Sequence, residues 1–234
     1  MNNLNLYILL ITMMLWGYGC ASHPPVLAKE PRKGETDMGF SFSAENVIPV
    51  IWFRRGLNRS TDIGLRIGLP LSGSGIDVNR ILFRNGSRKW DALNLAYNVS
   101  PNSSFDLTYY KFKKAKKAKR GEMPSVSWIG FRGMFIPYGI SKNQSQRFGI
   151  LYGRRFGKRY GFELGYNHDF RSMPLSQIVN LNWDPKDPDV VDKYGTSFQN
   201  YKHEYQGFPS EYSRLTGLSF QIFMYMDKNT KKKK

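Results

Sequence analysis

The side chains that most often carry out chemistry are scarce in this sequence. Its 234 residues include three histidines and one cysteine, Cys20. A serine, a histidine and an orienting acid can transfer an acyl group, and His168, Asp169 and Ser172 lie close together along the chain. However, the alternation of residues here places Asp169 and His168 on opposite faces of a strand. The sequence therefore predicts no catalytic residues, and an acyl-transferring enzyme is kept only as an alternative.

Metal and cofactor sites are not indicated either. No pair of histidines has the spacing of a metal-binding motif. The glycine-containing stretch Pro70–Gly75 (PLSGSG) is typical of a turn and does not match a phosphate-binding loop. The sequence thus predicts no metal and no cofactor, and the single cysteine excludes a disulfide within the chain.

The segment Gln146–Phe170 has the clearest pattern in the chain. From Tyr160 onward, large apolar residues occupy every second position, with glycines or single polar residues between them. Successive side chains of a strand point to opposite faces, so this period of two predicts a β-strand. The first half repeats the pattern, and Gly157 with Lys158 predicts a hairpin turn. A small, polar face suits the inside of a narrow barrel, and an apolar face bounded by aromatics suits a wall in contact with lipid.

The same alternation recurs along the chain and predicts an all-β fold. We expect an up-and-down antiparallel transmembrane β-barrel of about ten strands, with a range of eight to twelve, because closure removes the sheet edges. An even number of strands returns both termini to one side. The predicted strands are Gly34–Ala44, Val47–Phe53, Asp62–Leu69, Ile76–Phe83, Trp90–Val99, Phe105–Phe112, Val126–Tyr138, the two halves of Gln146–Phe170, and Leu218–Met226.

With these features the chain resembles small bacterial outer-membrane β-barrel proteins, over about Met38 to Met226. The resemblance rests on the architecture and on one short pattern, Arg55–Leu57 (RGL) followed by Asp62–Gly64 (DIG), which is similar to a hairpin of many outer-membrane barrel and lipoprotein sequences. It implies the bacterial outer membrane as the location and outer-membrane lipid as a partner.

The N-terminal residues resemble an export signal. Leu4–Tyr18 is an apolar segment of signal-peptide length, and Cys20 follows it in the context GYGCAS. This resembles a bacterial lipoprotein signal and implies a lipid on Cys20, with ordinary cleavage nearby as the alternative. Residues 1–20 are therefore predicted to be a signal peptide, and residues 21–35 a flexible tether.

The remaining organisation follows from the strand pattern. Residues 36–226 are predicted to form the barrel, and residues 227–234 a basic tail. Within the barrel, residues 171–212 contain clustered prolines and aspartates and predict a long outer loop. The polar side chains that share a strand face with the glycines, opposite the large apolar residues, are predicted to lie in the lumen. These are Asp62, Arg66, Glu163 and Asn167.

The net charge of +17 is unevenly distributed over the predicted connections. The connections 54–59, 84–89, 111–120 and 154–159, together with residues 228–234, contain 22 Lys and Arg and no Asp or Glu, whereas the other set contains five basic and seven acidic residues. One rim of the barrel should therefore be strongly basic, on the side of both termini. The residues assigned to this rim include Arg54, Arg55, Lys113, Lys114, Lys116, Lys117, Arg154 and Arg155.

These observations predict a barrel with a structural or surface-binding role, a basic periplasmic rim and a lipid anchor as an option. Basic side chains at a rim reach phosphate head groups, so membrane lipid is the first partner. An anionic periplasmic polymer or protein is the alternative partner. Nucleic acid is not expected as a partner, because an exported protein does not encounter it. Two further functions stay open, which are a narrow channel or small-ligand carrier and a lipid-modifying enzyme. The sequence indicates no oligomeric state.

Overall fold

The computed structural model describes residues 28–43, 46–68, 73–99, 103–116, 124–137, 145–169 and 218–226. Cys20, Lys117 and the predicted loop 171–212 lie outside the described residues. Within the described ranges, no helix is long and apolar enough to cross a membrane. The strands are β1 (Thr36–Ser43), β2 (Asn46–Gly56), β3 (Thr61–Ile67), β4 (Ser74–Asn85), β5 (Lys89–Val99), β6 (Ser104–Lys114), β7 (Val126–Ile136), β8 (Ser145–Phe156), β9 (Tyr160–Asp169) and β10 (Leu218–Met226).

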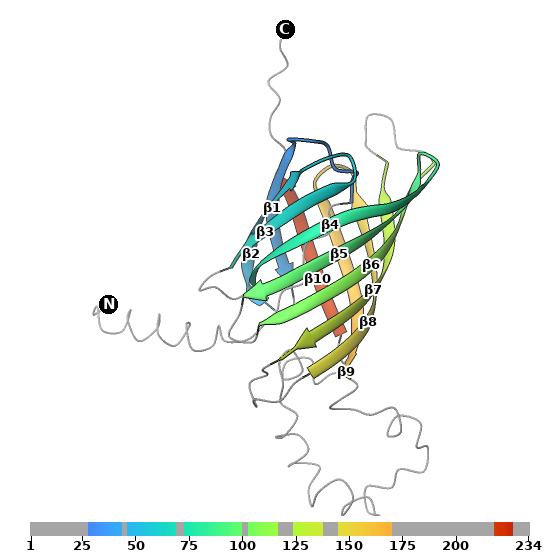
Figure 1. Ribbon diagram of the computed structural model, residues 1–234. Helices are drawn as coiled ribbons and strands as arrows, with labels where there is room; N and C mark the ends of the chain where they lie inside the picture. Colours follow the sequence, from blue (N-terminus) through green and yellow to red (C-terminus); the bar gives the residue numbers. More distant parts are fainter. Residues whose placement is uncertain are drawn as a thin grey trace, which may run out of the picture.

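The ten strands close into a single antiparallel barrel (Figure 1). Each strand pairs with its neighbours in sequence, and β1 completes the ring by pairing with both β2 and β10. Met38, for example, lies opposite Phe53 on one side and Met226 on the other. The predicted all-β, up-and-down barrel of ten strands is therefore confirmed.

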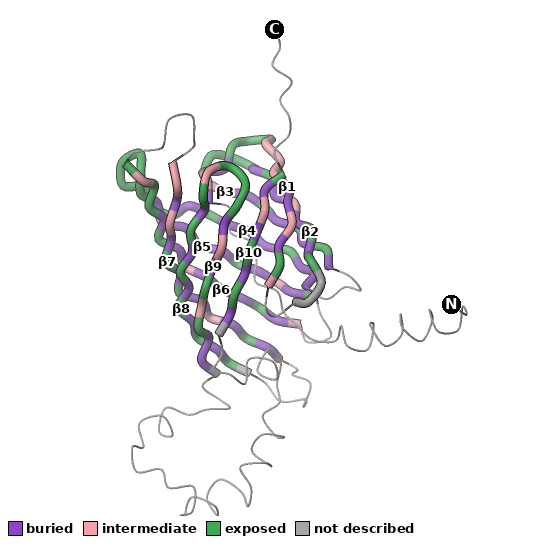
Figure 2. Tube along the Cα trace, turned by 180° about the vertical axis from the view of Figure 1, so that it is seen from behind, coloured by how far each residue is buried: buried purple, intermediate pink, exposed green. Residues whose placement is uncertain are grey.

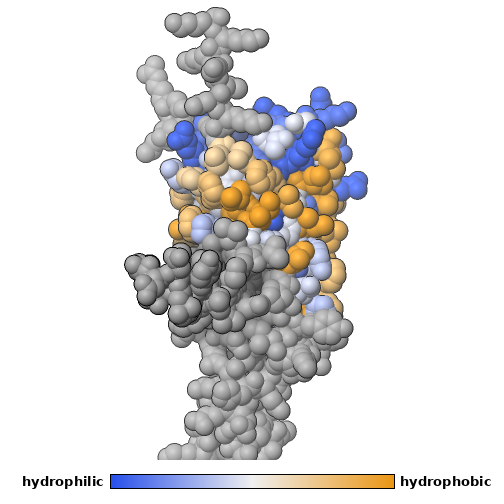
Figure 3. Space-filling view, turned by 90° about the vertical axis from the view of Figure 1, so that its left-hand side faces the viewer, coloured by the Kyte–Doolittle hydropathy of each residue, from blue (hydrophilic) through white to orange (hydrophobic). Residues whose placement is uncertain are grey.

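One end of the barrel carries most of the basic connections. The connections 57–60, 86–88 and 157–159 lie at this end, as do residues 115–116 and 124–125 beside β6 and β7. β1 also begins and β10 ends there. We call it the basic end; it is at the top in Figure 1. Figure 3 shows hydrophilic side chains gathered there and hydrophobic ones over the wall below. Because the strands run up and down, the basic connections share one end of the barrel.

Burial alternates along the strands, as the period of two requires (Figure 2). In β9, Gly161 and Glu163 are buried, whereas Tyr160, Leu164 and Tyr166 are exposed. Each of the ten strands presents at least one exposed large apolar residue. The inward rows instead contain glycines, polar and charged residues, and one group of aromatics. The barrel is thus apolar outside and largely polar inside.

Two irregularities break the alternation. The β1–β2 register shifts between Ser41 and Ser43, next to Pro49, whose missing N–H makes it a poor member of a regular ladder. The β4–β5 register shifts between Ile81 and Phe83. This second bulge changes the face on which the following residues lie, so Arg84 is opposite the buried Trp90. It also explains why the sequence of β4 alternates weakly.

A layer of aromatic side chains fills the interior near the basic end. Trp52, Trp90, Phe112, Trp128, Phe223 and Tyr225 are all buried there. Trp90 stacks on Phe112 with ring centroids 5.1 Å apart, and Trp128 contacts Phe223 at 5.8 Å.

Space for these rings comes from glycines on neighbouring strands. A Cβ on Gly153 would lie 2.1 Å from the Trp128 ring, and one on Gly39 would lie 2.4 Å from the Trp52 ring. Glycine at these positions is therefore a packing requirement of the aromatic layer.

Gly153→Ala should destabilise the barrel, because the new methyl group would displace the fully buried Trp128. Overpacking of this kind costs about 1–3 kcal/mol. The measurement is the urea midpoint of the refolded barrel, followed by tryptophan fluorescence. Gly133→Ala is the control, since its Cβ would meet no atom closer than 3.6 Å, and its midpoint should stay near that of the wild type. Equal shifts for the two variants would refute the packing role of Gly153.

Candidate functional site

The chain before β1 enters the basic end of the barrel. Ala28 is fully buried among the aromatic side chains, and its backbone N–H donates to the Tyr225 hydroxyl at 3.2 Å. Residues 34 and 35 then join the end of β2, because the Gly34 N–H donates to the Gly56 carbonyl at 2.8 Å and the Gly56 N–H donates to the Glu35 carbonyl at 2.9 Å. Residues 28–35, predicted to belong to a flexible tether, are thus packed into the barrel.

Ion pairs fix this segment further. The Lys29 ammonium lies 2.6 Å from an oxygen of Asp37 on β1 and 3.1 Å from Glu35. On the other side, the Arg84 guanidinium lies 3.4 Å from Glu30. Arg84 reaches this position because of the bulge in β4, and it also donates to the Arg59 carbonyl at 2.5 Å. The segment therefore bridges β1 and β4 across the basic end.

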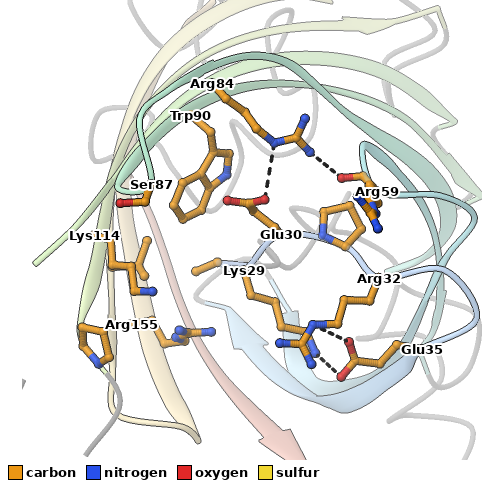
Figure 4. Close-up of a pocket in the computed structure, with 14 residues that line it drawn as sticks. Lys29, Glu30, Arg32, Glu35, Arg59, Arg84, Ser87, Trp90, Lys114 and Arg155 are labelled. Atoms are coloured by element: carbon orange, nitrogen blue, oxygen red, sulfur yellow. Dashed lines mark hydrogen bonds and ion pairs between the residues drawn. The ribbon is translucent and has the colours of Figure 1, made fainter.

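Between this segment and the barrel wall lies a cavity of about 880 Å³ (Figure 4). We call it the mouth cavity. Residues 28–32 and Glu35 form one wall, Arg59, Arg84, Ser87 and Lys114 contribute from the strand ends, and Trp90, Val126 and Arg155 line it beside the aromatic layer. Six of its lining residues are cationic and two are carboxylates. The cavity therefore has a positive balance and an apolar floor.

The two carboxylates of the mouth cavity already have cationic partners. Glu30 is paired with Arg84, and Glu35 with Lys29 and, at 3.9 Å, with Arg32. Arg155 is 7% exposed, and its Nε has no hydrogen-bond partner within the described part of the chain. Its guanidinium lies 5.9 Å from the centre of the Tyr225 ring, a cation–π distance.

Charged side chains inside the barrel also form a buried network. Arg54 bonds Asp62 through Nε at 2.7 Å and reaches Asp77 at 2.7 Å. Asn79 and Asn94 donate to these two carboxylates at 3.0 and 2.8 Å. This cluster joins β2, β3, β4 and β5.

A second chain of contacts continues the network. Arg66 donates to Asn98 at 2.5 Å, Asn98 donates to Asp106 at 3.0 Å, and Asp106 pairs with Arg132. On the far wall, the Trp128 indole N–H donates to Glu163 at 2.6 Å. The four deepest arginines, at positions 54, 66, 132 and 147, are matched by four buried carboxylates at positions 62, 77, 106 and 163. The deep interior is therefore electrically balanced.

The residues predicted to be lumenal all lie in this interior. Asp62 and Arg66 belong to the network, Glu163 accepts from Trp128, and Asn167 is buried on β9. The sequence pattern did not single out Asp77, Asp106 and Arg132, which join them. The alternation in the sequence could have identified them, since each occupies an inward-facing position of its strand.

Arg54 corrects the prediction of the basic rim. It was assigned to a turn beginning at residue 54, but β2 continues to Gly56 and turns Arg54 inward, where it is 2% exposed and paired with two aspartates. Arg155 also faces inward, at the mouth cavity. The other described residues assigned to this rim are exposed at the basic end: Arg55, Lys113, Lys114, Lys116 and Arg154.

His168 has a structural partner. Its Nδ1 lies 3.0 Å from the Tyr166 hydroxyl, and the side chain is 8% exposed. Ser172, considered with it in the sequence, lies outside the described residues. Among the described residues, no group of three or more His, Cys, Asp or Glu side chains could hold a metal ion.

Comparison with known proteins adds no family assignment. No protein-family model, no curated protein and no solved structure matches the chain.

Asp106→Asn should strongly destabilise the barrel, because it removes the charge that faces the buried Arg132. Breaking a buried ion pair costs about 3–5 kcal/mol. Denaturant unfolding in detergent measures the change. Asp91→Asn is the matched control: Asp91 is half-buried and accepts a hydrogen bond from the Tyr109 hydroxyl at 2.5 Å, so its replacement should cost about 1 kcal/mol or less. If the Asp106 variant is as stable as the Asp91 variant, the network does not hold the interior.

Proposed function

We propose that this protein is a bacterial outer-membrane β-barrel with a structural or surface-binding role. The observation that carries the proposal is the reversed polarity of the barrel. Exposed Ile, Leu, Val, Phe, Tyr and Met side chains occur on all ten strands, whereas the interior buries arginines and carboxylates. Water-soluble proteins rarely expose contiguous apolar patches larger than a few hundred Å². Lipid is the surrounding that makes such a wall favourable.

The distribution of charge on the wall supports the same conclusion. The charged side chains on outward-facing positions lie toward the basic end: Lys111, Lys113 and Arg154 are close to strand ends, and Arg80 lies opposite Thr61, the first residue of β3. Toward the middle, residues such as Leu65, Leu95 and Leu164 occupy the outward positions. An apolar band with charges only near one edge matches a hydrocarbon layer bordered by head groups.

The interior argues against the channel alternative. Trp52 and Trp128 in the aromatic layer, and Arg66 and Arg132 below it, are fully buried. A ten-strand barrel is narrow, and here side chains occupy its inside. The mouth cavity is instead compatible with a carrier or binding role at one end. The proposal therefore includes no conduction through the barrel and no catalytic residue.

In this proposal the basic end faces the periplasm, and the loop 171–212 lies outside the cell. β1 begins and β10 ends at the basic end, so a lipid on Cys20 would be held by the periplasmic leaflet. Mass spectrometry that finds a mature N-terminus downstream of Cys20 would remove the lipid anchor from the proposal. The proposed partners are outer-membrane lipid and an anionic periplasmic polymer or protein. Each basic residue close to an anionic surface contributes about 1 kcal/mol of attraction.

Leu164→Arg distinguishes a membrane barrel from a water-soluble one. Leu164 is 47% exposed near the middle of β9. In a bilayer the substitution should cost about 2–4 kcal/mol, whereas on a wet surface it should change stability by about 0.5 kcal/mol or less. The fraction of heat-modifiable, folded protein in the outer-membrane fraction measures the effect. Tyr160→Arg, at the start of the same strand, should be tolerated. An undiminished folded fraction for Leu164→Arg would argue for a soluble barrel.

The orientation can be tested with two cysteines placed at opposite ends of the barrel. Ser87 lies in the turn at the basic end, and Ser103 precedes β6 at the other end. In a Cys20→Ser background, a membrane-impermeant maleimide added to intact cells should label Ser103→Cys and spare Ser87→Cys. Permeabilised cells should label both, which controls for reactivity. The reverse pattern in intact cells would place the basic end outside.

A further inference from the structure

We propose that the mouth cavity binds a ligand that carries a phosphate group, with Arg155 as the buried contact and Lys114 as the outer contact. The inference goes beyond the proposed membrane location, because it concerns a site inside the barrel. It does not depend on which side of a membrane the basic end faces.

Arg155 is the first reason for this assignment. It is 93% buried, whereas its neighbour Arg154 is exposed and lies over the Phe156 ring on the outer face. A buried guanidinium without a counter-charge is costly, and such groups are normally paired. Its guanidinium lies 5.9 Å from the centre of the Tyr225 ring, and it forms no ion pair with a carboxylate among the described residues; its Nε has no hydrogen-bond acceptor there. The side chain lines the mouth cavity, so an acceptor in the cavity can reach it.

The deeper arginines show what Arg155 lacks. Arg54 contacts two aspartates, and Arg132 contacts Asp106. The four deepest arginines and the four buried carboxylates balance one another. Arg155 therefore adds a positive charge that this network does not neutralise.

The other charges of the cavity do not supply the missing anion. Glu30 and Glu35 are committed to Arg84, Lys29 and Arg32. Lys114 and Arg59 have no carboxylate partner among the described residues. The lining has six cations against two carboxylates, and Asp37 pairs with Lys29 from outside the lining, which leaves a local surplus of three positive charges. Figure 4 shows Arg155 and Lys114 on the same side of the cavity, opposite the segment that contains Glu30 and Glu35.

Phosphate fits this surplus better than a single carboxylate. A phosphate monoester carries about 1.5 to 2 negative charges and three acceptor oxygens, so it can satisfy a guanidinium and an ammonium together. Arginine offers paired N–H donors to two of these oxygens, while lysine acts as a point charge. The floor of Trp90 and Val126 excludes water from one side and strengthens these contacts. A volume of about 880 Å³ accommodates a small ester or a lipid head group.

Isothermal titration of the full-length protein in non-ionic detergent tests the site, with glycerol phosphate as the probe. Arg155→Gln should weaken binding about tenfold or more, because it removes the charge-assisted hydrogen bonds of the guanidinium to the phosphate. Arg154→Gln is the matched control, with the same loss of charge on the adjacent, outward-facing residue, and it should change the affinity less than about twofold. Equal losses of affinity for both variants would show that binding depends only on the overall positive charge of the basic end, and would overturn the proposal.

A second pair of variants guards against misfolding of the buried substitution. Lys114 is exposed, so Lys114→Gln should fold normally and still weaken binding, whereas Lys113→Gln on the outer face should not. Heat-modifiable gel mobility confirms the fold of each variant. No binding of glycerol phosphate to the wild type, or unchanged binding by Lys114→Gln and Arg155→Gln, would overturn the site.

Further probes identify the source of the phosphate. Dihexanoyl phosphatidic acid carries the same phosphate monoester on a lipid; tighter binding than glycerol phosphate would indicate a lipid head group, and the reverse order would indicate a free phosphate ester. Both results support the site. Acetate that binds as tightly as glycerol phosphate would show a general anion site and would overturn the phosphate assignment.

Discussion

Closure of ten strands into one ring is the constraint on which the rest of this structure depends. It sends every second side chain into a narrow interior that must be filled without voids, clashes or unpaired charges. The chain largely meets this condition with two groups of side chains, and the buried Arg155 at the mouth cavity is the exception. Near the basic end, indole and phenyl rings pack against glycines, as Trp128 does against Gly153. Elsewhere in the interior, four arginines are matched by four carboxylates, and asparagines donate hydrogen bonds to three of these carboxylates.

The same constraint explains the character of the outer wall. With most buried charges matched inside and backbone groups paired around a closed ring, the outward positions are free to carry apolar side chains on every strand. The strand ends then decide where charge appears. The connections that follow β2, β4, β6 and β8 leave from one end of the barrel, and the basic residues of the sequence are concentrated in and beside them. A single architecture thus separates an apolar wall, a neutral interior and a positive mouth.

Much of this could be predicted from the sequence, because strands of period two reveal their inward and outward rows directly. The rows of β9, with Glu163 and Leu164 on opposite faces, are an example. What could not be predicted depends on small departures from that period. The assignment of Arg54 failed because the end of β2 was placed three residues too early. The inward turn of Arg84 depends on a bulge, which leaves only a weak trace in the sequence. The packing of residues 28–35 depends on long-range contacts, for which local composition carries no signal.

The contact between Ala28 and Tyr225 has a consequence for the way the molecule is built. These residues are 197 positions apart, and Tyr225 belongs to the last strand. Bringing such distant parts together carries a loop-closure entropy that no local interaction offsets in advance. The contact of Ala28 with Tyr225 can therefore form only when β10 has taken its place in the ring. A buried Ala28 at the basic end thus marks a barrel whose last strand is in place.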